Sequence, residues 1–130
     1  MTDAPSGLRL RRRSKLLEVS WPDGVVHELP CEYLRVLSPS AEVRGHGDGE
    51  RILQTGKKHV NITNVEAVGN YAVKLTFDDG HDTGLYTWAY LRELGDEQAE
   101  RWSAYEAELD AANASRLPPI TLGTWTPDAH

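Results

Sequence analysis

Hydrophobic and polar residues alternate with a period of two in several short stretches, a pattern typical of half-buried β-strands. Residues rich in proline, aspartate and glycine separate these stretches and favour tight turns, as residues 22–24 (PDG) do. Pro30 favours the start of a helix and Pro39 favours its end. The first part of the chain therefore predicts strands over residues 8–11, 16–21 and 25–29 and a short helix over residues 32–37.

The second part of the chain shows the same alternation. Gly69 and Asn70 mark one turn, and residues 78–80 (DDG) mark another. We expect a short helix to follow and to end at Gly95, because glycine commonly terminates helices. These patterns predict strands over residues 59–63, 72–77 and 81–86, and a helix over residues 88–94.

A longer helix is predicted near the C-terminus. Asp96 is suited to capping it, and acidic residues in its first turn suit the positive end of the helix dipole. Apolar residues recur at helical spacing up to residue 112, so one face should pack on the domain. That face consists of Trp102, Tyr105, Leu109 and Ala112.

Two stretches of the chain resemble each other. Residues 19–24 (VSWPDG) match residues 75–80 (LTFDDG), and residues 33–37 (YLRVL) match residues 90–94 (YLREL). Each unit indicates a strand, an Asp-Gly turn, a strand and a short helix, although a chance match of common turns is the alternative. Hairpins become stable when a sheet has one covered face. We predict an α+β fold, with a mostly antiparallel β-sheet of two related hairpin–helix units and a longer C-terminal helix.

The length of 130 residues fits one domain. We expect residues 1–7 to be disordered, residues 8–112 to form the domain, and residues 113–130, with three prolines, to form an irregular tail. The apolar side chains of this tail either dock on the domain or contact a partner. Residues 41–58 contain four glycines and lack periodicity, which is typical of a functional loop.

Charge is distributed unevenly along a chain whose net charge is −6. Residues 1–15 carry five bases and one acid, whereas the remaining residues carry nine bases and nineteen acids. The basic residues suit a solvated edge strand, and the acidic remainder disfavours a nucleic-acid partner. Cys31 is the single cysteine, which excludes an internal disulfide and a multi-cysteine metal site. Without a signal-like segment or an apolar run of about 20 residues, we expect a cytoplasmic protein with no membrane partner.

Acidic residues and histidines could form a metal site. Residues 78–82 (DDGHD) combine carboxylates with an imidazole, ligands that suit divalent ions such as zinc or iron. Neighbouring side chains on a hairpin point alternately to opposite faces, so a solvated turn is the alternative. If a metal binds, the sequence indicates the ligands His81, His46, Asp79 and Asp82.

The glycine-rich segment suggests a binding surface for a protein or a small ligand. His46 lies between two glycines, and glycines allow backbone to approach a ligand closely. Aromatic residues after the second Asp-Gly turn either fill the core or extend this surface. The predicted ligand or partner surface comprises Gly45, His46, Gly47, Asp79, Gly80, His81, Tyr86 and Trp88.

Three segments carry a resemblance to a known family. The segments LRVLSPSAEVRGHG, GKKHVNI and VGNYAVKLTFDDGHDTGLYTWAYLREL resemble the small bacterial proteins of the DUF971 family, which is similar to the N-terminal domain of γ-butyrobetaine hydroxylase and trimethyllysine hydroxylase. The resemblance covers roughly residues 8–112. It implies a β-rich module without the separate catalytic barrel, so we expect no hydroxylase activity.

In those hydroxylases the N-terminal module resembles a zinc-binding domain with three cysteines and one histidine. The resemblance places the cysteine positions at Ser38, Ser40 and Val43, and the histidine position at His81. Three of the four ligands therefore differ here, and serine is a poor zinc ligand. Related domains also occur beside carriers of iron–sulfur clusters. The sequence thus favours a non-catalytic accessory module that binds another protein, with a zinc-binding or iron-binding protein as the alternative.

Overall fold

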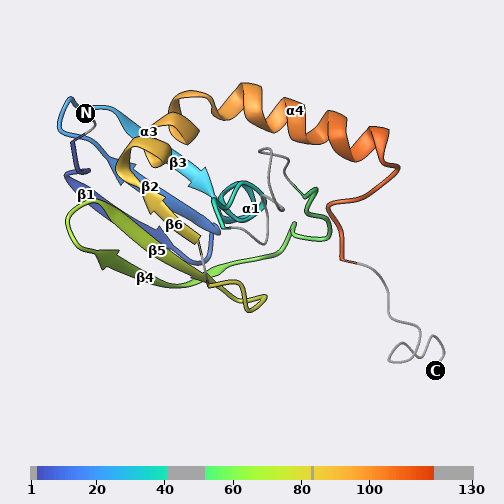
Figure 1. Ribbon diagram of the computed structural model, residues 1–130, viewed down its shortest axis with the longest axis horizontal. Helices are drawn as coiled ribbons and strands as arrows, with labels where there is room; N and C mark the ends of the chain where they lie inside the picture. The colour runs from blue at the N-terminus through green and yellow to red at the C-terminus, as the bar shows by residue number, and fades with distance from the viewer. Residues whose placement is uncertain (1–2, 41–51, 83, 119–130) are drawn as a thin grey trace.

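The computed structural model describes residues 3–40, 52–82 and 84–118 (Figure 1). The strands follow the alternating stretches of the sequence, and each three-stranded group is followed by a short helix. None of the described helices is both long and apolar enough to cross a membrane. The elements are β1 (Gly7–Arg11), β2 (Leu16–Ser20), β3 (Val26–Pro30), α1 (Cys31–Val36), β4 (Ile62–Val68), β5 (Ala72–Phe77), β6 (Gly84–Thr87), α3 (Trp88–Asp96) and α4 (Gln98–Ala111).

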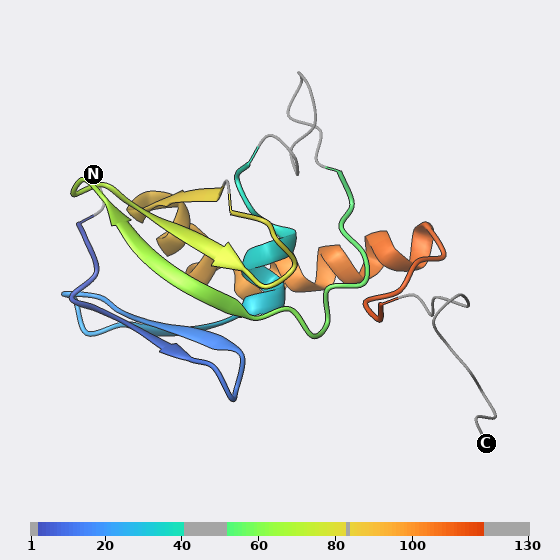
Figure 2. The same cartoon turned by 90° about the horizontal axis from the view of Figure 1, so that it is seen from below.

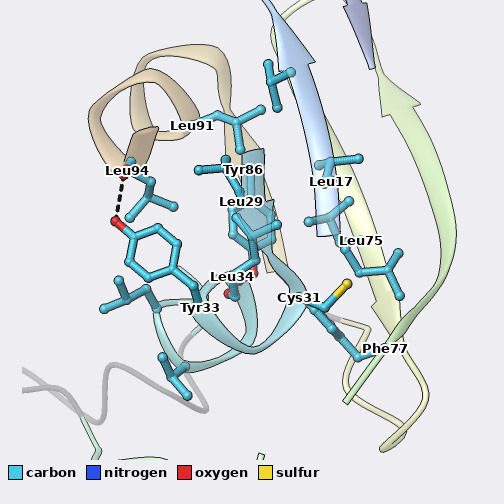
Figure 3. Close-up of a cluster of buried hydrophobic side chains, with 14 of the residues drawn as sticks. Leu17, Leu29, Cys31, Tyr33, Leu34, Leu75, Phe77, Tyr86, Leu91 and Leu94 are labelled. Atoms are coloured by element: carbon cyan, nitrogen blue, oxygen red, sulfur yellow. Dashed lines mark hydrogen bonds between the residues drawn. The ribbon is translucent and has the colours of Figure 1, made fainter. Parts of the chain in front are cut away.

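The described strands form two antiparallel sheets, β1-β2-β3 and β4-β5-β6, rather than one. Figure 2 shows them as two layers, with α1 and α3 beside them and α4 extending away from the strands. The inward side chains of both sheets belong to a single core, which includes Leu17 of β2, Leu75 of β5 and Leu34 of α1 (Figure 3). The predicted α+β class is confirmed, with its antiparallel strands divided between two sheets.

The internal repeat is also present in the structure, because its two Asp-Gly turns have the same pattern of backbone hydrogen bonds. In the first turn the N–H of Trp21 donates to Val25 O and the N–H of Gly24 donates to Trp21 O. In the second turn the equivalent bonds run from Phe77 to the carbonyl of His81 and from the N–H of Gly80 to Phe77 O. The glycine of each turn has φ +90°, a conformation that favours glycine.

The two units also exchange contacts through their helices. The hydroxyl of Tyr33 in α1 donates to the carbonyl of Leu94 in α3. The hydroxyl of Tyr90 in α3 donates in return to the carbonyl of Leu37, which follows α1. These are equivalent positions of the two YLRxL segments. Each unit therefore donates a tyrosine hydrogen bond to a backbone carbonyl near the end of the other unit's short helix.

Several predicted boundaries were wrong. Gly95 does not end the short helix but lies inside α3, where an added Cβ would be 2.2 Å from Nδ1 of His27. Asp96 does not cap α4, because its carboxylate is hydrogen-bonded to His27 and Arg92. Ala112 is exposed. The strand predicted over residues 59–63 is β4 at residues 62–68, and the one predicted over residues 81–86 is β6 at residues 84–87.

The beginning of the predicted tail is docked on the domain. The carbonyl of Ser115 accepts from the N–H of Gly56 at 3.0 Å, and the carbonyl of Arg116 accepts from that of Lys58 at 2.9 Å. The Arg116 guanidinium donates to both carboxylate oxygens of Glu32 and lies 5.0 Å from the ring centroid of Trp102. Residues 113–118 thus connect α4 to α1. The apolar tail residues Ile120, Leu122 and Trp125 lie outside the described residues.

Candidate functional site

The turn between β5 and β6 carries a carboxylate held by three donors. Oδ2 of Asp79 accepts hydrogen bonds from Arg35 Nε at 2.8 Å and from Lys57 Nζ at 2.6 Å. Its other oxygen, Oδ1, accepts from the backbone N–H of His81 at 3.1 Å. Positively charged residues from two distant segments therefore meet at this turn. We call Arg35, Ser38, Lys57, Asp79 and His81 the Asp79 cluster.

The pKa of Asp79 lies at about 2, below its usual value of 3.8. Burial raises this pKa, but the hydrogen bonds from Lys57, from the backbone of His81 and from Arg35 together outweigh that effect. The carboxylate is therefore charged throughout the physiological pH range. Such a carboxylate is better suited to holding positively charged side chains in place than to acting as a general acid or base.

A buried hydrogen bond lies beside this carboxylate. Oγ of Ser38 is 2.9 Å from Nε2 of His81, and both residues are buried. An added Cβ at Gly84 would lie 2.6 Å from the same hydroxyl, so only glycine allows β6 to pass this closely. The hydroxyl thus engages the imidazole at the position where the resemblance implies a cysteine ligand.

The predicted metal ligands do not converge in the described structure. Within residues 3–40, 52–82 and 84–118, no group of three His, Cys, Asp or Glu side chains is placed to hold a metal ion. Asp82 is exposed, whereas His81 is buried next to Ser38. His46 and Val43 lie outside the described residues. The structure therefore gives no metal geometry from which to derive chemistry.

The Asp79 cluster joins the two chain segments that flank residues 41–51. Arg35 and Ser38 precede that segment, and Lys57 follows it. Their hydrogen bonds all end on the single turn that carries Asp79 and His81. The predicted loop residues Gly45, His46 and Gly47 lie outside the described residues. The described residues before and after them in the chain are bonded to the same turn.

The aromatic residues of the predicted surface have mainly structural contacts. Tyr86 is fully buried, and its hydroxyl donates to the carbonyl of Leu34, so its side chain is in the core rather than on a surface. Burial raises the pKa of Tyr86. Trp88 is half-buried and donates from Nε1 to the carbonyl of Asn70 at 2.8 Å. Of this surface, the exposed described residues are those of the turn, Asp79 and Gly80, although the carboxylate side chain of Asp79 is itself largely covered.

Sequence reasoning missed Arg35 and Lys57 as members of the site. The repeat contained the signal for Arg35, because Arg92 occupies its equivalent position and binds Asp23, the equivalent of Asp79. The two pairs differ in burial: the side chain of Asp23 is 55% exposed, whereas that of Asp79 is 21% exposed. Nη1 of Arg35 is buried without a hydrogen-bond partner among the described residues. The second turn is thus the more enclosed of the two.

Cys31 is not a reactive thiol in this structure. It is fully buried, and its Sγ lies 3.6 Å from Oδ1 of Asn61. Burial raises the pKa of the Cys31 thiol, which disfavours the nucleophilic thiolate. Its role is packing between the sheets and α1.

The fold is that of a small α+β domain built from two similar units, each with three strands and a short helix. The sequence assigns this chain to a family. Residues 8–92 match the family model described as gamma-butyrobetaine hydroxylase-like, N-terminal. The chain belongs to this family, which confirms the resemblance inferred from its motifs. No curated protein matches the chain.

Solved structures show the same fold. One NMR solution structure is 44% identical, with a TM-score of 0.80, and the match covers 97% of this chain and 99% of that chain. A second NMR solution structure is 52% identical, with a TM-score of 0.78, covering 96% and 93%. A crystal structure of a protein of unknown function from the DUF971 family of Acidithiobacillus ferrooxidans is 42% identical, with a TM-score of 0.56, covering 70% and 91%.

Proposed function

We propose that this chain is a non-catalytic interaction module that presents residues 41–58 and the Asp79 turn to a partner protein. One observation supports the proposal most directly: Asp79 is bonded to Arg35, which precedes residues 41–51, and to Lys57, which follows them. A binding segment held at its base by a rigid scaffold loses less conformational entropy when a partner binds.

The chemistry of the Asp79 cluster favours binding over catalysis. Asp79 is charged and bonded to three donors, and Nε2 of the buried His81 is engaged by Ser38. Neither side chain is offered to a substrate. The net charge of −6 also favours a protein partner over a nucleic acid.

Affinity capture with matched variants tests this proposal. The intact chain and two variants, Asp79→Asn and the triple change of Gly45, His46 and Gly47 to alanine, would be immobilised, and retained proteins would be quantified by mass spectrometry. We expect both variants to lose a partner that the intact chain retains. Asp23→Asn changes the equivalent carboxylate of the other unit and should keep that partner. Equal retention by all four proteins would overturn the proposal.

A further inference from the structure

The two sheets leave two strand edges beside each other. Among the described strands, β1 pairs with β2 alone and β4 pairs with β5 alone. A groove of about 350 Å³ lies between these edges. Its apolar lining residues are Leu8, Leu10 and Leu17 of one sheet and Val65 of the other, and its polar lining residues are Arg12, Thr63 and Asn64, with Arg12 donating to the carbonyl of Thr63 at one end. Both layers are visible in Figure 2. An unpaired edge that carries apolar side chains on one face is a template for an added strand.

The side chains of β1 alternate between two environments. Leu8 and Leu10 are half-buried and line the groove, whereas Arg9 and Arg11 are exposed on the opposite face. A strand added beside β1 would place its own side chains alternately in these two environments. Apolar side chains would then lie over the leucines, and acidic side chains would lie next to the arginines.

Positive charge is concentrated at this edge and is only partly neutralised by its surroundings. Glu18 accepts a hydrogen bond from Arg11 at 2.6 Å and is also the register partner of Arg9, and Glu28 is the register partner of Glu18 on β3. Two carboxylates therefore lie beside Arg9 and Arg11, while the turn after β1 adds further positive charge. Arg13 and Lys15, in the turn after β1, form no ion pair with any described residue. Outside residues 1–15 the chain carries nine bases and nineteen acids. A long phosphate polymer would meet that acidic remainder, whereas a short acidic peptide segment would not.

We propose that β1 is a docking edge for an extended, acidic segment of a partner protein, which adds to sheet β1-β2-β3 as a fourth strand. Its acidic side chains lie beside Arg9 and Arg11, and its apolar side chains cover Leu8 and Leu10. This surface uses different residues from the Asp79 cluster. It goes beyond the proposed function, and either proposal can fail without the other.

An NMR titration of the intact chain tests the docking edge. The probe is an end-blocked heptapeptide that alternates glutamate and valine, and the readout is the shift of the β1 backbone amides. We expect these amides to shift and binding to weaken as salt rises. Arg9→Gln should weaken binding about fivefold, because it removes one cross-strand charge pair. Arg9→Glu should weaken binding further. Lys74→Glu, on the other sheet, is the matched charge reversal and should leave binding unchanged.

Three further probes and a dilution series distinguish the other occupants of this edge. A lysine–valine heptapeptide should not shift the β1 amides, because its charge is repelled. Heptaglutamate or single-stranded DNA that binds as tightly as the alternating peptide would show an electrostatic patch instead and would overturn the proposal. Shifts of β1 on dilution without peptide would show self-association of this chain and would also overturn it. Since Arg9→Gln adds no charge opposite Glu18, it keeps the test valid if Arg9→Glu fails to fold.

Discussion

Tyr33 donates its hydroxyl hydrogen bond to the carbonyl of Leu94, 61 positions further along the chain, at 2.6 Å. Leu94 stands in the second YLRxL segment at the position that Leu37 holds in the first, and Leu37 accepts the equivalent bond from Tyr90. The arginines of the same two segments repeat the exchange, because Arg35 bonds to the second turn and Arg92 bonds to the first. Each unit is therefore stabilised by side chains of the other.

Removal of the Tyr33 hydroxyl should destabilise the whole domain. Tyr33→Phe leaves the carbonyl of Leu94 without this partner in a buried site, so we expect a loss of about 1–2 kcal/mol in the free energy of unfolding. Urea denaturation should show a lower midpoint with an unchanged slope. Tyr71→Phe is the matched control, because Tyr71 is 54% exposed, and its midpoint should equal that of the intact chain.

Acid should reveal the contribution of Asp79. Its pKa is about 2 in the folded chain against a usual value of 3.8, so the stabilisation is fully present above about pH 4 and is lost as the pH falls toward 2. For a partly exposed group we expect a contribution of about 1–2 kcal/mol. Asp79→Asn should flatten the stability curve between pH 4 and 2, measured by urea denaturation at each pH. If the variant keeps the slope of the intact chain, the Asp79 carboxylate does not stabilise this turn.

The Glu32–Arg116 pair should couple the tail to α1. Glu32 has a side chain that is 7% exposed, so Arg116→Ala would leave a buried carboxylate without its bidentate partner. Because Arg116 is itself 36% exposed, we expect a loss of about 2 kcal/mol, below the value typical of fully buried pairs. A double-mutant cycle with Glu32→Gln should give a coupling energy above about 1 kcal/mol. Additive effects of the two single changes would contradict the pairing.

Metal addition separates the interaction module from the zinc or iron alternative. We expect neither Zn²⁺ nor Fe²⁺ to raise the thermal midpoint, because Ser38 engages Nε2 of His81 and no described cluster supplies three ligands. A true site would add about 2.7 kcal/mol at a hundredfold excess of metal over Kd. A gain of that size that disappears in His81→Ala but persists in His59→Ala would establish a metal site at the base of residues 41–51.

The hairpins of this fold could be predicted because local chemistry specifies them. Asp23 and Asp79 precede glycines with φ +90°, and the alternation of Leu17 and Val19 marks the buried face of β2. The α+β class and the repeat followed from these local signals. The family followed from the motifs between residues 34 and 94.

The division into two sheets could not be predicted from the same pattern. A period of two identifies the buried face of a strand but does not say which strand lies opposite. The roles of Gly95 and Asp96 depended on His27, which is distant in sequence and packs against both. Likewise, nothing in the sequence around Lys57 indicated that its side chain would bond to Asp79. Contacts between distant residues thus overrode the local preferences for helix ends and caps.

The reciprocal bonds have a consequence for how this domain can be divided. Each half carries the tyrosine and the arginine that the other half needs, and residues 41–51 connect the two halves in the sequence. The domain is in effect a dimer of two similar subunits held on one chain. Two fragments cut within residues 41–51 should therefore reassemble when mixed, whereas neither fragment alone should hold its helix in place.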